Sequence, residues 1–255
     1  MIYKRVTARL KAQDWLAITI EIGIVVIGVF IGTLVANWNA ERVDKAAVER
    51  LITQLQPRLR QLQGLAADDI AYYGVVRGFA KTAKAGWAND PAVSERDFVV
   101  AAFQATEISS FNNNPFYDGS LIGVEEVRKV DDAEMRERLM TLISYRSGFL
   151  DLFGEGSAYR EQVRSIIPDD LQLRILTECG DKQAEKSRHF WLNPTCGMII
   201  DPALAQSAAA ALRARPELKQ TLTSHLAHIN RHLFSDVAYG KLLARVDQRI
   251  TETQQ

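Results

Sequence analysis

The fold of this chain is decided by residues 16–36, LAITIEIGIVVIGVFIGTLVA, which predict a helix that crosses a membrane. Among these 21 residues, Glu21 is the single ionisable one. An α-helix of this length spans about 31 Å, close to the hydrocarbon thickness of a bilayer. Trp15 and Trp38 lie at the two ends, and we expect both rings to anchor the helix at the membrane interfaces. The sequence therefore predicts one transmembrane helix over residues 16–38.

The charges on the two sides of this helix predict its orientation. Residues 1–15 carry four basic side chains and one acidic one, namely Lys4, Arg5, Arg9, Lys11 and Asp14, whereas acids and bases balance after the helix. Basic residues next to a membrane helix favour the cytoplasmic side. We therefore expect residues 1–15 to form a short cytoplasmic tail at a bacterial inner membrane, with residues 39–255 in the periplasm. A cleaved signal peptide is the alternative, but such peptides usually have a shorter apolar run and a small-x-small cleavage site.

Beyond the membrane helix, apolar periodicity predicts an all-α fold, in which the transmembrane helix continues into a helical bundle. Apolar residues alternate at spacings of four and three in the predicted stalk helix over residues 40–84, and they form a similar stripe in the last predicted helix, over residues 216–251. We expect residues 39–255 to form one periplasmic domain. The exception is a small irregular or β insert at residues 169–201, for which the sequence predicts short strands at 171–176 and 198–200.

Cys179 and Cys196 are the two cysteines of the sequence. In an oxidising compartment two such cysteines can pair, and in the chain-entropy picture closing so short a loop adds about 3 kcal/mol of stability. Two buried free thiols are the alternative, and zinc bound with Asp181 and His189 is a weaker one. The predicted topology favours the disulfide.

One face of the membrane helix differs from the rest in carrying an acid and small residues. At 100° per residue, Gly28, Gly32 and Asn39 fall within about 20° of Glu21, and Ala36 lies about 60° away. A carboxylate in lipid is costly, and a Gly-x-x-x-Gly pair lets two helices approach closely. We expect this face to contact a second copy or another membrane protein. In the alternatives, Glu21 reaches the inner headgroups or serves a proton or cation path.

The sequence gives little sign of catalysis, cofactors or nucleic acid. His225, His228 and His232 lie at metal-compatible spacings on the last predicted helix, but no acid or cysteine is placed locally to complete a site, so they are weak metal candidates and no cofactor is expected. The common nucleophile, phosphate-loop, dinucleotide and zinc-protease motifs are absent from the sequence. The 31 basic and 31 acidic residues leave no basic excess for nucleic acid.

The membrane helix also resembles a known family. Glu21-Ile22, Val25-Val26-Ile27-Gly28 and Asn37-Trp38-Asn39, followed by Glu41-Arg42, resemble the "E-I-x-x-V-V-I-G … N-W-N-x-E-R" opening of bacterial single-span inner-membrane proteins. That family is one of unknown function, with no activity assigned to it. The resemblance implies the same inner-membrane topology and a helical exterior domain, and no particular activity.

Together these features favour a non-enzymatic, membrane-anchored periplasmic module that acts as a subunit, scaffold or adaptor of a membrane protein complex. Its expected partners are the lipid bilayer and either a second copy of the chain or another membrane protein. A periplasmic ligand-binding sensor that signals through a partner is the first alternative. A hydrolase or metal enzyme is the second.

Overall fold

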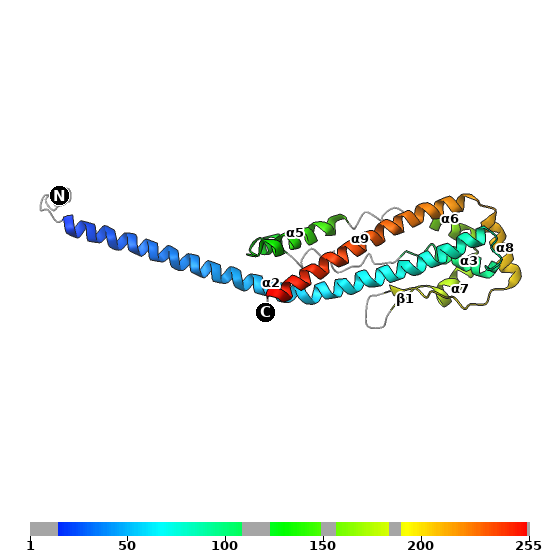
Figure 1. Ribbon diagram of the computed structural model, residues 1–255, viewed down its shortest axis with the longest axis horizontal. Helices are drawn as coiled ribbons and strands as arrows, with labels where there is room; N and C mark the ends of the chain where they lie inside the picture. The colour runs from blue at the N-terminus through cyan, green and yellow to red at the C-terminus, as the bar shows by residue number, and fades with distance from the viewer. Residues whose placement is uncertain (1–14, 109–122, 149–156, 184–189, 254–255) are drawn as a thin grey trace. The chain divides into compact units, whose positions relative to one another are not determined.

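The computed structural model describes residues 15–108, 123–148, 157–183 and 190–253. The chain divides into two compact units, Met1–Leu51 and Ile52–Gln255. The described residues of both are predominantly helical (Figure 1), so the predicted all-α class is confirmed. Helix α2 (Trp15–Trp87) begins in the first unit and ends in the second.

The first unit contains the apolar part of α2. By length and composition this is the one helix in the described part of the chain that is long and apolar enough to cross a membrane. From Ile20 to Val35 its large apolar side chains, such as Val25, Phe30 and Leu34, are exposed. That exposure is what a helix surrounded by lipid requires, because lipid tails are as apolar as these side chains.

The second unit is organised around α2 and the last helix, α9 (Glu217–Thr253), which run antiparallel (Figure 1). Gln56 donates a hydrogen bond to Thr251 over 3.4 Å, and Arg60 pairs with Asp247 at 3.4 Å. Along α2, one series of buried residues is spaced at alternating steps of four and three: Leu55, Leu59, Leu62, Ala66, Asp69, Tyr73, Val76, Ala80, Ala83 and Trp87. This is the seam of a two-helix coiled coil.

The remaining core forms around the C-terminal part of α2. Helices α3 (Glu95–Gln104), α6 (Ala158–Ile166), α7 (Asp169–Cys179) and α8 (Pro202–Arg213) pack there, with α3 lying against both α6 and α8. Ser94 begins α3 by accepting a hydrogen bond from the Asp97 amide, and Asp201 begins α8 in the same way ahead of Pro202. These caps satisfy amides that the first turn of a helix leaves without partners.

A smaller helical pair covers the other end of α9. Helices α4 (Val124–Arg128) and α5 (Ala133–Gly148) contact each other, and α5 packs on α9. Asp132 accepts hydrogen bonds from the amides of Glu134 and Met135 at the start of α5, and Arg249 of α9 reaches its second oxygen at 2.8 Å. The cap of α5 is therefore also its link to α9.

The predicted strands of the insert are wrong. Residues 171–176 lie inside α7, because Leu171, Ile175 and Cys179 recur at steps of four and are all buried on one helix face. Residues 198–200 form no strand. The observed strands are β1 (Lys182–Gln183) and β2 (Phe190–Trp191), which pair antiparallel. Short apolar runs do not by themselves distinguish strand from helix.

The predicted disulfide is present. Cys179, the last residue of α7, is bonded to Cys196 in the segment after β2, with their Cα atoms 5.3 Å apart. Cys179 is buried in the main core, and Cys196 packs against it. The bond therefore holds the irregular segment before α8 to the helical core.

We predict that the close approach of α3 to α2 makes Gly86 irreplaceable, unlike Gly64 on the same helix. A Cβ on Gly86 would lie 2.2 Å from Cδ2 of Phe98, whereas one on Gly64 would meet nothing within 4 Å. Gly86→Ala should lower the free energy of unfolding by about 1–3 kcal/mol through overpacking. Gly64→Ala should raise it by about 0.5–1 kcal/mol, since alanine is the better helix former. Denaturant unfolding followed by circular dichroism measures both, and equal effects of the two substitutions would contradict this packing.

Candidate functional site

Three ionisable side chains meet inside the α2–α9 seam. Asp69 comes from α2, and His232 and Asp236 come from consecutive turns of α9. The three residues are only 6%, 6% and 3% exposed. With its proton on Nε2, His232 donates a hydrogen bond to Asp69 Oδ2 over 2.5 Å, and Asp236 Oδ2 lies 3.2 Å from the same nitrogen. We call these residues the seam cluster.

The walls of the seam cluster are apolar and aromatic. The Tyr73 ring packs edge-on against the His232 imidazole, with centroids 5.2 Å apart, and Tyr72 packs edge-on against Tyr73. Val76 and Ile229 are fully buried in the same group. In such surroundings charges interact strongly and an uncompensated charge is costly.

The carboxylate oxygens of the seam cluster are incompletely satisfied. A single Nε2 hydrogen points at Asp69 and cannot serve Asp236 as well. With both carboxyls ionised, Asp69 Oδ1 and Asp236 Oδ2 are buried and receive no hydrogen bond from the described residues. Burial and the facing charge of Asp69 raise the pKa of Asp236 to about 9, and a proton held there would be shared with Asp69. The cluster therefore calls for added positive charge, either a proton or a cation.

The three histidines proposed as weak metal candidates do not converge. His228 is exposed on the outer face of α9. His225 is buried, but its Nδ1 lies 2.8 Å from the Ser157 hydroxyl at the start of α6, and burial lowers its pKa to about 4. Only His232 has carboxylates beside it. The acids that surround it, Asp69 and Asp236, are residues that the sequence analysis missed.

A second polar group joins α6 to the end of α3. Glu107 is buried and pairs with Arg164 at 2.7 Å and Arg160 at 3.5 Å. Nearby, the Tyr72 hydroxyl donates to Asp181 over 2.7 Å. Burial raises the pKa of Glu107, although the two arginines act to lower it. Because each acid here has a partner, this network holds elements together and offers no unpaired group to a ligand.

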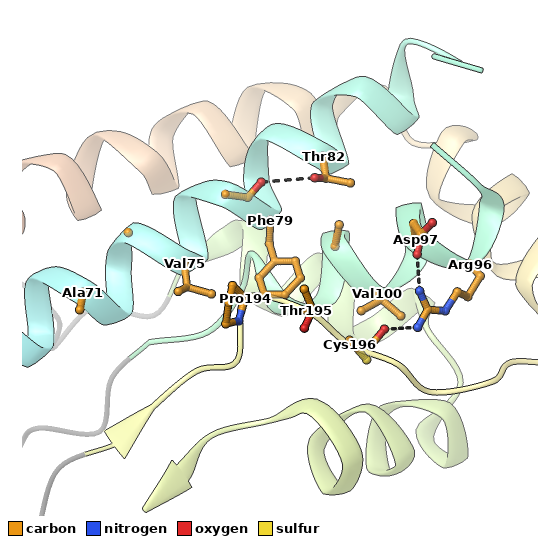
Figure 2. Close-up of a pocket in the computed structure, with 13 residues that line it drawn as sticks. Ala71, Val75, Phe79, Thr82, Arg96, Asp97, Val100, Pro194, Thr195 and Cys196 are labelled. Carbon is orange, nitrogen blue, oxygen red and sulfur yellow. Dashed lines mark hydrogen bonds and ion pairs between the residues drawn. The ribbon is translucent and has the colours of Figure 1, made fainter. Parts of the chain in front are cut away.

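A groove of about 530 Å³ lies between α2, α3 and the segment around Cys196 (Figure 2). Small residues of α2 keep it open, since a Cβ on Gly74 or Gly78 would meet nothing within 4 Å. Its charged end is already engaged: the Arg96 guanidinium contacts Asp97 and donates to the Cys196 carbonyl. The groove could accept an apolar group, but the Arg96 guanidinium is already bound by groups of the protein itself.

In the first unit, the residues of the predicted contact face are uncovered. Glu21, Gly28, Gly32, Ala36 and Asn39 are all exposed, and added Cβ atoms on the two glycines would meet nothing within 4 Å. Asn39 accepts a hydrogen bond from Arg42 over 3.1 Å. The predicted anchors Trp15 and Trp38 are each 67% exposed. These residues thus have the accessibility that a helix contact and two interface anchors need.

The fold defines the class of this chain as an all-α protein with one candidate membrane helix in its described part. No protein-family model, curated protein or solved structure matches the sequence. The resemblance of residues 21–42 to a family of single-span inner-membrane proteins therefore stays a prediction.

The raised pKa of Asp236 leads to a prediction about stability. In the folded protein this carboxyl keeps its proton to about pH 9, whereas an unfolded aspartate loses it near pH 4. Its contribution to stability is therefore fully present below about pH 4 and is lost as the pH rises towards 9. In EDTA, Asp236→Asn, which resembles the protonated acid, should unfold with a free energy about 1–3 kcal/mol higher than wild type at pH 9.

Thermal unfolding of the full chain in detergent, followed from pH 5 to pH 9, measures this difference. Because groups outside the seam cluster titrate equally in both proteins, the difference between variant and wild type reports on the seam cluster, in which Asp236 is the residue replaced. A difference that is constant across this range would show that Asp236 is ionised throughout.

Proposed function

We propose that this chain is a non-enzymatic helical module, anchored in a bacterial inner membrane by residues 16–38, whose second unit works in the periplasm as part of a membrane protein complex. The observation that carries the proposal is the Cys179–Cys196 disulfide in the second unit. Disulfides persist in oxidising compartments and are rare in the cytosol. The basic residues before the apolar helix favour the same orientation independently.

A role in assembly is supported by the exposed face of the apolar helix. In lipid, a carboxylate such as Glu21 is costly unless it faces protein, water or a headgroup. Gly28 and Gly32 lie on the same face and have open space above them. A second helix packed on this face would cover the glycines closely and shield the acid. The partner is a second copy of the chain or another membrane protein.

A non-enzymatic role is supported by how the polar groups outside the seam cluster are used in the second unit. Ser157 begins α6 by accepting a hydrogen bond from the Arg160 amide, and it contacts His225. Glu107 pairs with two arginines. Each of these groups makes a hydrogen bond or an ion pair that stabilises the fold.

The compartment of the second unit can be tested with reporters fused after Gln255. We expect alkaline phosphatase, which needs an oxidising compartment to fold, to be active, and green fluorescent protein to stay dark. In intact cells Cys179 and Cys196 should resist a membrane-permeant alkylating reagent until a reductant is added, because they are paired. The same reporters fused ahead of Met1 serve as the opposite control. A bright cytosolic signal from the fusion after Gln255 would falsify the proposed orientation.

The assembly face can be tested with two matched glycine substitutions in the membrane helix. Gly32 lies on the Glu21 face, and Gly23, nine residues earlier, lies about 180° away from it. Gly32→Leu should shift the complex to a smaller particle in blue-native electrophoresis, because the larger side chain prevents close helix approach. Gly23→Leu adds the same bulk to the opposite face and should leave the particle size unchanged. If neither variant changes the size, the proposed face is not an interface.

A further inference from the structure

We propose that Asp69, His232 and Asp236 form a binding site for a divalent transition-metal ion of the Zn²⁺ type, which joins α2 to α9. One ligand atom from each residue lies within 4.8 Å of the other two. This inference goes beyond the proposed function. It does not depend on that proposal, because all three residues belong to the second unit and neither the membrane helix nor the compartment enters the argument.

The spacing of the donor atoms suits one small ion. Zinc bonds to imidazole nitrogen and carboxylate oxygen are about 2.0–2.2 Å long, so neighbouring ligands around the ion lie roughly 3–3.5 Å apart. Asp236 Oδ2 is 3.2 Å from His232 Nε2, and Asp69 Oδ2 is 2.5 Å from it. Placing an ion among them needs a side-chain shift of under about 1 Å at Asp69, with loss of the Nε2 proton.

The hydrogen-bond deficit points to the same ligand. Asp69 Oδ1 and Asp236 Oδ2 are buried oxygens without a partner among the described residues, and both side chains are more than nine-tenths buried. A divalent cation would neutralise the two carboxylates while binding a neutral imidazole. The site would then carry no net charge within its apolar walls, which is the condition for burying ions at low cost.

The donor set selects the class of metal. An imidazole nitrogen suits zinc and other first-row transition ions, whereas calcium and magnesium prefer six or more oxygen ligands, several of them water. The aliphatic side chains of Val76 and Ile229, buried in the same group, offer no oxygen to complete such a ligand set. A compact ion with few ligands therefore fits best.

The test uses the full chain in detergent, stripped with EDTA and dialysed against Zn²⁺. Wild type should retain about one Zn²⁺ per chain by elemental analysis. Asp69→Asn and Asp236→Asn each remove a ligand charge while keeping the side-chain shape, and calorimetry should show Zn²⁺ affinity reduced by more than the roughly 10–100-fold typical of losing an outer-shell partner. His228→Asn is the matched control. It removes an exposed histidine from the same helix and should bind Zn²⁺ as wild type does.

A second readout keeps the test valid if an asparagine variant fails to fold. Co²⁺ added to stripped wild type should give visible absorption bands of a nitrogen- and oxygen-coordinated ion. Zn²⁺ should also raise the melting temperature of wild type and of His228→Asn. The proposal is overturned if wild type retains no Zn²⁺ and gives no Co²⁺ bands, which would mean that a shared proton alone neutralises the cluster. It is equally overturned if His228→Asn loses as much affinity as Asp236→Asn.

Discussion

The second unit depends on the pairing of α2 with α9 along a seam whose buried positions recur every three or four residues, apart from one step of seven on α9 after Asp236. On α9 these positions are Leu218, Leu222, His225, Ile229, His232, Asp236, Leu243, Val246 and Ile250, all of them buried. Neither helix could bury its apolar stripe alone, since such a stripe needs a facing surface. The shorter helices then pack on this pair: α3, α6, α7 and α8 form a group in which α6 contacts α9, while α5 contacts α9 and α4 contacts α5.

A seam made only of apolar residues would leave the register of the two helices weakly specified. Sliding one helix by seven residues returns leucines and alanines to equivalent positions, so apolar packing alone distinguishes the two registers poorly. Asp69 changes this, because it is favourable only where it meets the hydrogen-bonding partner that His232 provides. A buried polar group in a seam lowers the stability of the helix pair relative to an apolar one. Its best-attested effect is to fix the register of the two helices. A cation could be held between these residues only in this register, so its binding would favour the register further.

The sequence predicted the long helices and the disulfide, but missed the seam cluster for an identifiable reason. A search for apolar residues alone steps from Ala66 to Tyr73, although a step of three from Ala66 lands on Asp69. On α9 the apolar Val237 is 41% exposed, and its neighbour Asp236 takes the inner position seven residues after Ile229. Searching for apolar residues alone hides polar residues at seam positions. Asp69 also lies 163 residues from His232 in sequence, so only the fold reveals their contact.

Both units contain carboxylates in apolar surroundings, but they differ in which groups can stabilise these carboxylates. In the second unit, the acids Asp69 and Asp236 are removed from water by the chain itself, and His232 of the same chain supplies part of the compensation. In the first unit, Glu21 lies on the segment that is apolar enough to cross a membrane, and its side chain is exposed. Lipid cannot compensate a carboxylate. Within a bilayer, the group that shields Glu21 must therefore come from beyond this helix: from a headgroup, from water, or from a protein packed on the Gly28 and Gly32 face.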